Sequence, residues 1–127
     1  MDENPKDPWP SEIRLTENGR VLRVSFENGE SYDLSAEYLR VMSPSAELQG
    51  HRPEEHVTLG GKRQCGITGV EPVGTYAVRL IFDDLHATGI FTWSYLYELG
   101  AHYREKWASY EAELKTKGLS RDKAGQA

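Results

Sequence analysis

Two stretches of the chain share one pattern of hydrophobic and polar positions. In each, an alternating run is followed by a polar turn, a second short run and a Tyr-Leu segment. Leu22 and Val78 begin the two copies 56 positions apart, whereas Tyr38 and Tyr95 lie 57 apart, so the second turn holds one extra residue. Because period-two alternation is typical of half-buried strands, each copy predicts a β-hairpin that leads into a helical turn.

Further strands and two helices are predicted around these hairpins. A short strand is expected at 13–15, and residues 67–74 lead into the strongest predicted strand, at 76–82. Ser35 is placed to cap a short helix that ends at Ser43-Pro44, and Thr92 or Ser94 is placed to cap a long one. The long helix carries apolar residues at steps of three and four, which puts them on one face. They are Leu96, Leu99, Tyr103, Trp107, Tyr110 and Leu114.

These elements predict an α+β fold. Its antiparallel sheet is built from the two repeated hairpins as four strands, with a short helix after the first hairpin and a long C-terminal helix packed on the sheet. Residues 1–10 are expected to be a flexible lead-in, 11–118 a single domain and 119–127 a disordered tail. Residues 43–64 form a long polar loop, and loops of this length are often functional.

Composition narrows the classes of function. The 127 residues carry a net charge of −5, which argues against nucleic acid or anionic membranes as partners. No apolar run approaches the roughly 20 residues that span a bilayer, and the first residues lack signal-peptide features. Cys65 is the single cysteine, so an internal disulfide and a thiolate cluster within one chain are excluded. We expect a cytoplasmic protein.

Two longer motifs are familiar. The first is Leu39-Arg-Val-Met-Ser-Pro-Ser-Ala-Glu47, followed by Gly50-His51. The second runs from Gly69 through Glu71-Pro72 to Asp84, with His86 and the segment 88–96 after it. In this order they resemble the gamma-butyrobetaine hydroxylase-like N-terminal domain family, which includes bacterial stand-alone members grouped as domain of unknown function 971. The resemblance covers roughly residues 13–99.

The resemblance implies a function in which this chain catalyses no reaction. In the hydroxylases this module precedes an iron- and 2-oxoglutarate-dependent catalytic domain, and a similar segment is attached to some P-loop ATPases with iron–sulfur clusters. This chain ends after the module and one helix, so we expect no enzyme. The resemblance implies a non-catalytic accessory module that acts with a metalloenzyme or an iron–sulfur assembly partner.

The resemblance also implies a structural zinc site in the hydroxylases. The matching positions in this sequence are Ser43, Ser45, Leu48 and His86. Neither serine hydroxyls nor leucine hold Zn²⁺ at neutral pH, so we expect the inherited site to be lost. No cofactor is therefore expected, and zinc or iron remains the alternative.

Several polar residues leave two interpretations open. Asp83, Asp84 and His86 suit a carboxylate–imidazole site for a metal or a partner, or simply a solvated hairpin turn. His51 and His56 could join His86 around a metal if the central loop folded over the hairpin, and His51 is also a candidate for contact with a partner. The alternative function is therefore a small metal-binding protein that uses His86 with His51, His56 or Asp83.

Three further residues are candidates for contact with other molecules. Trp107 and Tyr110 belong either to the packed core or to an apolar patch that binds a partner or a second copy, which allows a monomer or a weak homo-oligomer. Cys65 is either a small buried residue or, beside Lys62 and Arg63, a reactive thiol. No Gly-rich phosphate loop, Ser/His/Asp triad or paired-carboxylate motif is visible in the sequence.

Overall fold

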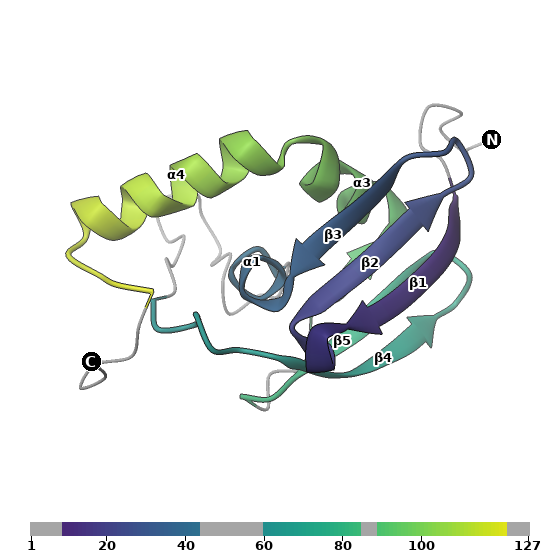
Figure 1. Cartoon of the computed structure of the whole chain (residues 1–127), viewed down its shortest axis with the longest axis horizontal. Coiled ribbons are helices and arrows are strands. Elements are labelled where there is room, and N and C mark those ends of the chain that lie inside the picture. The colour runs from purple at the N-terminus through teal and green to yellow at the C-terminus, as the bar shows by residue number, and fades with distance from the viewer. Residues whose placement is uncertain (1–8, 44–59, 85–88, 122–127) are drawn as a thin grey trace.

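The computed structural model describes residues 9–43, 60–84 and 89–121, and these form two three-stranded antiparallel sheets with helices around them (Figure 1). Each sheet follows the order of the chain. The first contains β1 (Pro10–Thr16), β2 (Val21–Phe26) and β3 (Ser31–Ser35), with the short 3-10 helix η1 (Glu17–Gly19) between β1 and β2. The second contains β4 (Ile67–Val73), β5 (Ala77–Phe82) and β6 (Ile90–Thr92).

Three α-helices lie in the described part of the chain: α1 (Ala36–Val41), α3 (Trp93–Ala101) and α4 (Tyr103–Thr116). The predicted caps are confirmed, because the Ser35 side chain accepts a hydrogen bond from the Tyr38 amide at 3.0 Å and Thr92 accepts one from the Tyr95 amide at 3.1 Å. No helix among these residues combines the length and the apolar character needed to cross a membrane.

The predicted long C-terminal helix is divided at His102. The backbone there has φ −118° and ψ 31°, which is outside the helical region and separates α3 from α4. The Leu99 carbonyl, in the last turn of α3, accepts a hydrogen bond from the Tyr38 hydroxyl at 2.7 Å. The end of α3 is therefore fixed by a partner on α1, and α4 starts in a new direction.

The repeat extends further than the two hairpins. Each half is a β-β-β-α unit, with β1 to α1 in one and β4 to α3 in the other. The first strand of each unit carries a register irregularity at the same place, between Pro10 and Glu12 in β1 and between Ile67 and Gly69 in β4. The irregularities are 57 positions apart, so the two halves match strand by strand.

The α+β class, the hairpins and the order of the helices are confirmed, but the expected single four-stranded sheet is wrong. Each hairpin pairs with the strand that precedes it in its own half: Pro10 lies opposite Phe26, and Ile67 lies opposite Phe82. β1 therefore extends the first hairpin and β4 extends the second, and the two three-stranded sheets are separate.

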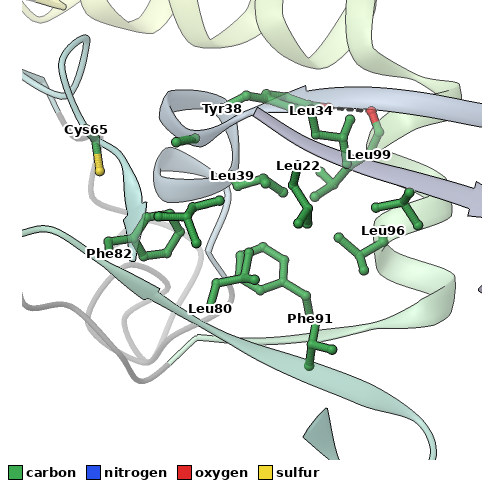
Figure 2. Close-up of a cluster of buried hydrophobic side chains, with 14 of the residues drawn as sticks. Leu22, Leu34, Tyr38, Leu39, Cys65, Leu80, Phe82, Phe91, Leu96 and Leu99 are labelled. Atoms are coloured by element: carbon green, nitrogen blue, oxygen red, sulfur yellow. Dashed lines mark hydrogen bonds between the residues drawn. The ribbon is translucent and has the colours of Figure 1, made fainter. Parts of the chain in front are cut away.

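The main hydrophobic core draws side chains from both sheets, from α1 and from α3 (Figure 2). Its fully buried large residues are Leu22, Val24, Leu34, Tyr38, Leu39, Leu80, Phe82, Phe91, Leu96 and Leu99. A second, smaller cluster joins Val41 of α1 to Tyr110 and Leu114 of α4. Thus α3 packs against the sheets, whereas α4 lies over α1 (Figure 1).

Both ends of the described chain are held by backbone hydrogen bonds. The Trp9 carbonyl accepts from the Glu27 amide at 2.9 Å, next to the start of β1. Residues 119–121, which the sequence analysis assigned to a disordered tail, return to residues 61–63 through hydrogen bonds of 2.8 and 2.9 Å. The C-terminal segment therefore reaches the stretch that leads into β4.

Candidate functional site

A cluster of charged side chains links α1, the stretch before β4 and the turn after β5. Asp84 accepts hydrogen bonds from Arg40 Nε at 2.9 Å and from Lys62 Nζ at 2.5 Å. The three side chains retain only 9 to 21% of their exposure. Because these charges are partly withdrawn from water, their interaction is stronger than that of a surface ion pair.

A pocket of about 280 Å³ opens beside this cluster. Its wall contains Gly61, Lys62, Gln64, Cys65, Asp83 and Asp84. The turn that supplies the two aspartates is tied to β4, because an Asp83 carboxylate oxygen accepts from the Gly66 amide at 3.0 Å and the Asp83 amide donates to the Gly66 carbonyl at 2.8 Å. The pocket therefore offers groups of both signs on a fixed backbone.

The surroundings of the thiol in the pocket wall disfavour its thiolate form. Cys65 is 7% exposed, and burial, followed by the negative charges of Asp84 and Asp83, raises its pKa to about 12. Lys62 and Arg40 lower it by less. The thiolate is the form that attacks electrophiles and ligates metals, so the structure favours a small buried cysteine over a reactive one.

The other half of the repeat contains an equivalent of the contact between Arg40 on α1 and Asp84 in the turn after β5. Arg40 and Asp84 correspond, by the offsets of 57 and 56 residues, to Tyr97 and Asn28. That equivalent pair also touches, with Asn28 Nδ2 donating to the Tyr97 hydroxyl at 3.3 Å, but it is neutral and exposed. A neutral pair joins helix to turn in one half, so the buried charges in the other half exceed what this contact needs.

The structure brings together two of the predicted site residues, Asp83 and Asp84, and adds Arg40 and Lys62, which the sequence analysis did not assign to a site. His51, His56 and His86 lie outside the described residues. Within the described ranges, no group of three or more His, Cys, Asp or Glu side chains is arranged to hold a metal ion.

The zinc implied by the family resemblance can be tested at one matching position, since Ser45, Leu48 and His86 lie outside the described residues. Ser43 is 3% exposed and packs so closely against Gly89 that a Cβ on that glycine would lie 2.0 Å from the serine oxygen. This position therefore holds a neutral hydroxyl in a tight packing contact. The residue does not fit a zinc ligand.

The two aromatic candidates on α4 lie in a packed row. Tyr110 is 4% exposed and contacts Val41 and Leu114, so it belongs to the packed core and not to an exposed apolar patch. Trp107 is half-buried, with its ring centroid 5.1 Å from that of Tyr110 and 6.1 Å from that of Tyr103. The exposed end of the row is Tyr103, at 42%.

Solved structures of similar sequence share this fold. One solution NMR structure is 47% identical, with 94% of this chain and 97% of that chain covered and a TM-score of 0.77. A second NMR structure is 38% identical over 100% of this chain and 98% of that one, with a TM-score of 0.79. A crystal structure of a DUF971-family protein of unknown function from Acidithiobacillus ferrooxidans ATCC 23270 is 39% identical, covers 78% of this chain and 99% of that one, and has a TM-score of 0.63.

No curated protein sequence matches the chain. A family model does match: the one described as "Gamma-butyrobetaine hydroxylase-like, N-terminal" aligns with residues 13–97, from the third residue after the start of β1 into α3. This range includes most of both halves of the repeat and both aspartates of the pocket. The chain belongs to the gamma-butyrobetaine hydroxylase-like N-terminal domain family.

Proposed function

We propose that the protein is a non-catalytic accessory module that binds a protein partner at the pocket beside Asp84, and that this partner is a metalloenzyme or an iron–sulfur assembly factor. The observation that identifies this surface as the binding site is the contrast between the two halves of the repeat. One helix–turn contact is neutral, and its counterpart is a partly buried charge cluster with a pocket beside it.

The chemistry of the pocket suits a basic group of the partner. Asp83 and Asp84 lie in its wall, and Lys62, also in the wall, is one of the two cations that bind Asp84. A partner lysine or arginine that enters the pocket could share or replace this contact without leaving a buried carboxylate unpaired. The net charge of −5 favours approach of a basic surface over an acidic one.

The class of partner comes from the family. In the hydroxylases that the sequence resembles, the module stands beside an iron-dependent catalytic domain. A separate metalloprotein bound in trans would be the equivalent arrangement for this chain. The class of the partner is therefore a hypothesis based on analogy between domains of the same fold. The pocket beside Asp84 is the surface at which this hypothesis can be tested.

Affinity capture with three full-length baits tests the proposal. The baits are the wild type, Asp83→Asn, and Asp33→Asn as a matched control that removes an exposed carboxylate on β3. We expect a metalloprotein or cluster-assembly factor with the wild type and the control, and depletion with Asp83→Asn. With the purified partner, Asp83→Asn should weaken binding about tenfold, which corresponds to about 1.4 kcal/mol. Equal capture by all baits, or a partner without metal or cluster, would contradict the proposal.

Elemental analysis of protein prepared without a His tag separates this function from metal binding by His86 with His51, His56 or Asp83. The accessory-module proposal requires no resident metal, so added Zn²⁺ or Fe²⁺ should leave the melting temperature unchanged. Stoichiometric metal with a metal-dependent rise in stability would replace the proposal by the metal-binding alternative.

A further inference from the structure

The C-terminal residues 118–121, here called the strap, fix the backbone on both sides of Lys62. The Gly61 amide donates to the Ser120 carbonyl at 2.8 Å, and the Arg63 amide donates to the Arg121 carbonyl at 2.9 Å. A Cβ at residue 60 would lie 2.8 Å from the Ser120 oxygen, so the strap approaches as closely as a glycine permits.

One partly buried ion pair anchors the strap to α1. Arg121 donates to both carboxylate oxygens of Glu37, at 2.8 and 2.7 Å, and the Glu37 side chain is only 7% exposed. The same guanidinium lies 5.2 Å from the centre of the Trp107 ring. Hydrogen bonding to Glu37 raises the pKa of Arg121, which keeps its guanidinium charged.

The strap and the pocket belong to one closed circuit of contacts. Glu37 and Arg40 lie one turn apart on α1, and Arg40 holds Asp84. Asp84 in turn holds Lys62, whose backbone neighbours are held by the strap. The circuit therefore returns to Arg121, the residue that Glu37 binds.

We propose that the strap controls access to the pocket: while Arg121 stays on Glu37, Lys62 stays on Asp84, and release of the strap uncovers Asp84 and Cys65. This inference takes its biological meaning from the proposed binding function, but the opening itself needs no partner. The strap is suited to local release, because its Leu119 is 43% exposed and it is held mainly by backbone hydrogen bonds and by the Arg121 side chain. Segments with little buried apolar surface open at lower free energy than the whole domain unfolds.

The single cysteine gives a direct probe of opening. Cys65 lines the pocket and is buried, so its modification by a soluble disulfide reagent reports how often the pocket is uncovered. Arg121→Ala removes the anchor, and we expect modification to become about tenfold faster, since opening no longer breaks the two hydrogen bonds to the Glu37 carboxylate. Arg23→Ala is the matched control, because Arg23 makes a similar two-pronged contact with Asp33 on the first sheet.

Denaturant dependence distinguishes opening of the strap from unfolding. Low concentrations of urea should change the modification rate of Arg121→Ala only slightly, because little surface is exposed in a local opening. A chain that ends at Gly118 should react as fast as Arg121→Ala or faster. The proposal is overturned if Arg121→Ala reacts no faster than Arg23→Ala, or if its reaction has the urea dependence of global unfolding. Neither result involves a partner, so each is distinct from a failure of the proposed binding function.

Discussion

Tyr38 and Tyr95 are equivalent residues of the two repeated halves. The hydroxyl of each donates a hydrogen bond to a backbone carbonyl at the helix end of the other half. Tyr38 on α1 reaches the carbonyl of Leu99 at 2.7 Å, and Tyr95 on α3 reaches that of Met42 at 2.6 Å. Leu99 follows Met42 by the same 57 positions that separate the two tyrosines. The domain is thus held together by a reciprocal exchange across an internal pseudo-twofold relationship.

Removing either hydroxyl should destabilise the domain while the ring keeps its packing. Tyr38→Phe leaves a buried helix-end carbonyl without its partner, which should lower the free energy of unfolding by about 1–2 kcal/mol. Tyr95→Phe should have an effect of the same order. Urea unfolding measures both, with Tyr76→Phe as the control because Tyr76 is 53% exposed. An equal effect at Tyr76 would contradict the importance of the exchange.

Alkaline pH should destabilise the protein through the same residues. Burial raises the pKa of Tyr95 and of Tyr110 to about 12, and burial also raises the pKa of Tyr38. An unfolded tyrosine titrates near 10. The folded state therefore binds protons more tightly, so its stability is complete below about pH 10 and is lost as the pH rises towards 12.

The measurement is urea unfolding from pH 8 to 11, combined with phenolate absorbance near 295 nm. The unfolding midpoint should fall above pH 10, and the phenolate signal of these buried tyrosines should appear together with unfolding. Ionisation of all seven tyrosines in the native state near pH 10 would show that the buried phenols are not held protonated.

Local signals made much of the fold predictable from sequence. The alternation in β2 and β5 and the hydroxyl caps at Ser35 and Thr92 depend on residues within a few positions of each other. The hairpins and helix starts were therefore predicted correctly. The strand β4 was harder to assign to the repeat, because Gly69 and Pro72 interrupt its alternation.

The break between α3 and α4 was not predictable from periodicity. The apolar spacing continues through Tyr103 and Trp107, but these two rings lie next to Tyr38 on α1, whereas Leu96 and Leu99 enter the main core. Apolar residues that follow one continuous helical spacing in the sequence can therefore pack against two different neighbours, from two separate helices. Only the tertiary partners show where the helix must change direction.

The charge cluster was missed for a related reason. Arg40 and Asp84 are 44 residues apart, and Lys62 and Asp84 are 22 apart. Pairing between distant charged residues leaves no periodic mark in a single sequence. The repeat was the available signal: aligning its halves places Arg40 opposite Tyr97 and would have shown that one helix–turn contact is charged and its counterpart is neutral.

Asp84→Asn should test that contrast directly. The substitution leaves Arg40, which is 7% exposed, without a charged partner in the cluster, and we expect a loss of about 2–4 kcal/mol of stability. Asn28→Ala, at the equivalent position of the other half, should cost no more than about 1 kcal/mol, because it removes only exposed, neutral hydrogen bonds with the Tyr97 hydroxyl and with the Glu30 amide. Urea unfolding of both variants provides the comparison. Similar losses would mean that the two contacts contribute equally to the fold and that the buried charges add nothing beyond the neutral contact.

A glycine substitution tests the contact between the two halves at η1. Gly19 has φ +85°, and a Cβ there would lie 2.4 Å from the carbonyl oxygen of Ile67 at the start of β4. Gly19→Ala therefore adds a clash with backbone to the cost of a left-handed residue, which alone is about 1–2 kcal/mol. Gly29→Ala is the matched control, because Gly29 has φ +92° and nothing within 4 Å of the added Cβ. Since only Gly19 carries the clash, Gly19→Ala should lose at least about 1 kcal/mol more in urea unfolding, given that overpacking typically costs 1–3 kcal/mol. Equal losses would mean that the first sheet can move away from β4 at little cost, and that the reciprocal tyrosine contacts, rather than this close approach, hold the halves in register.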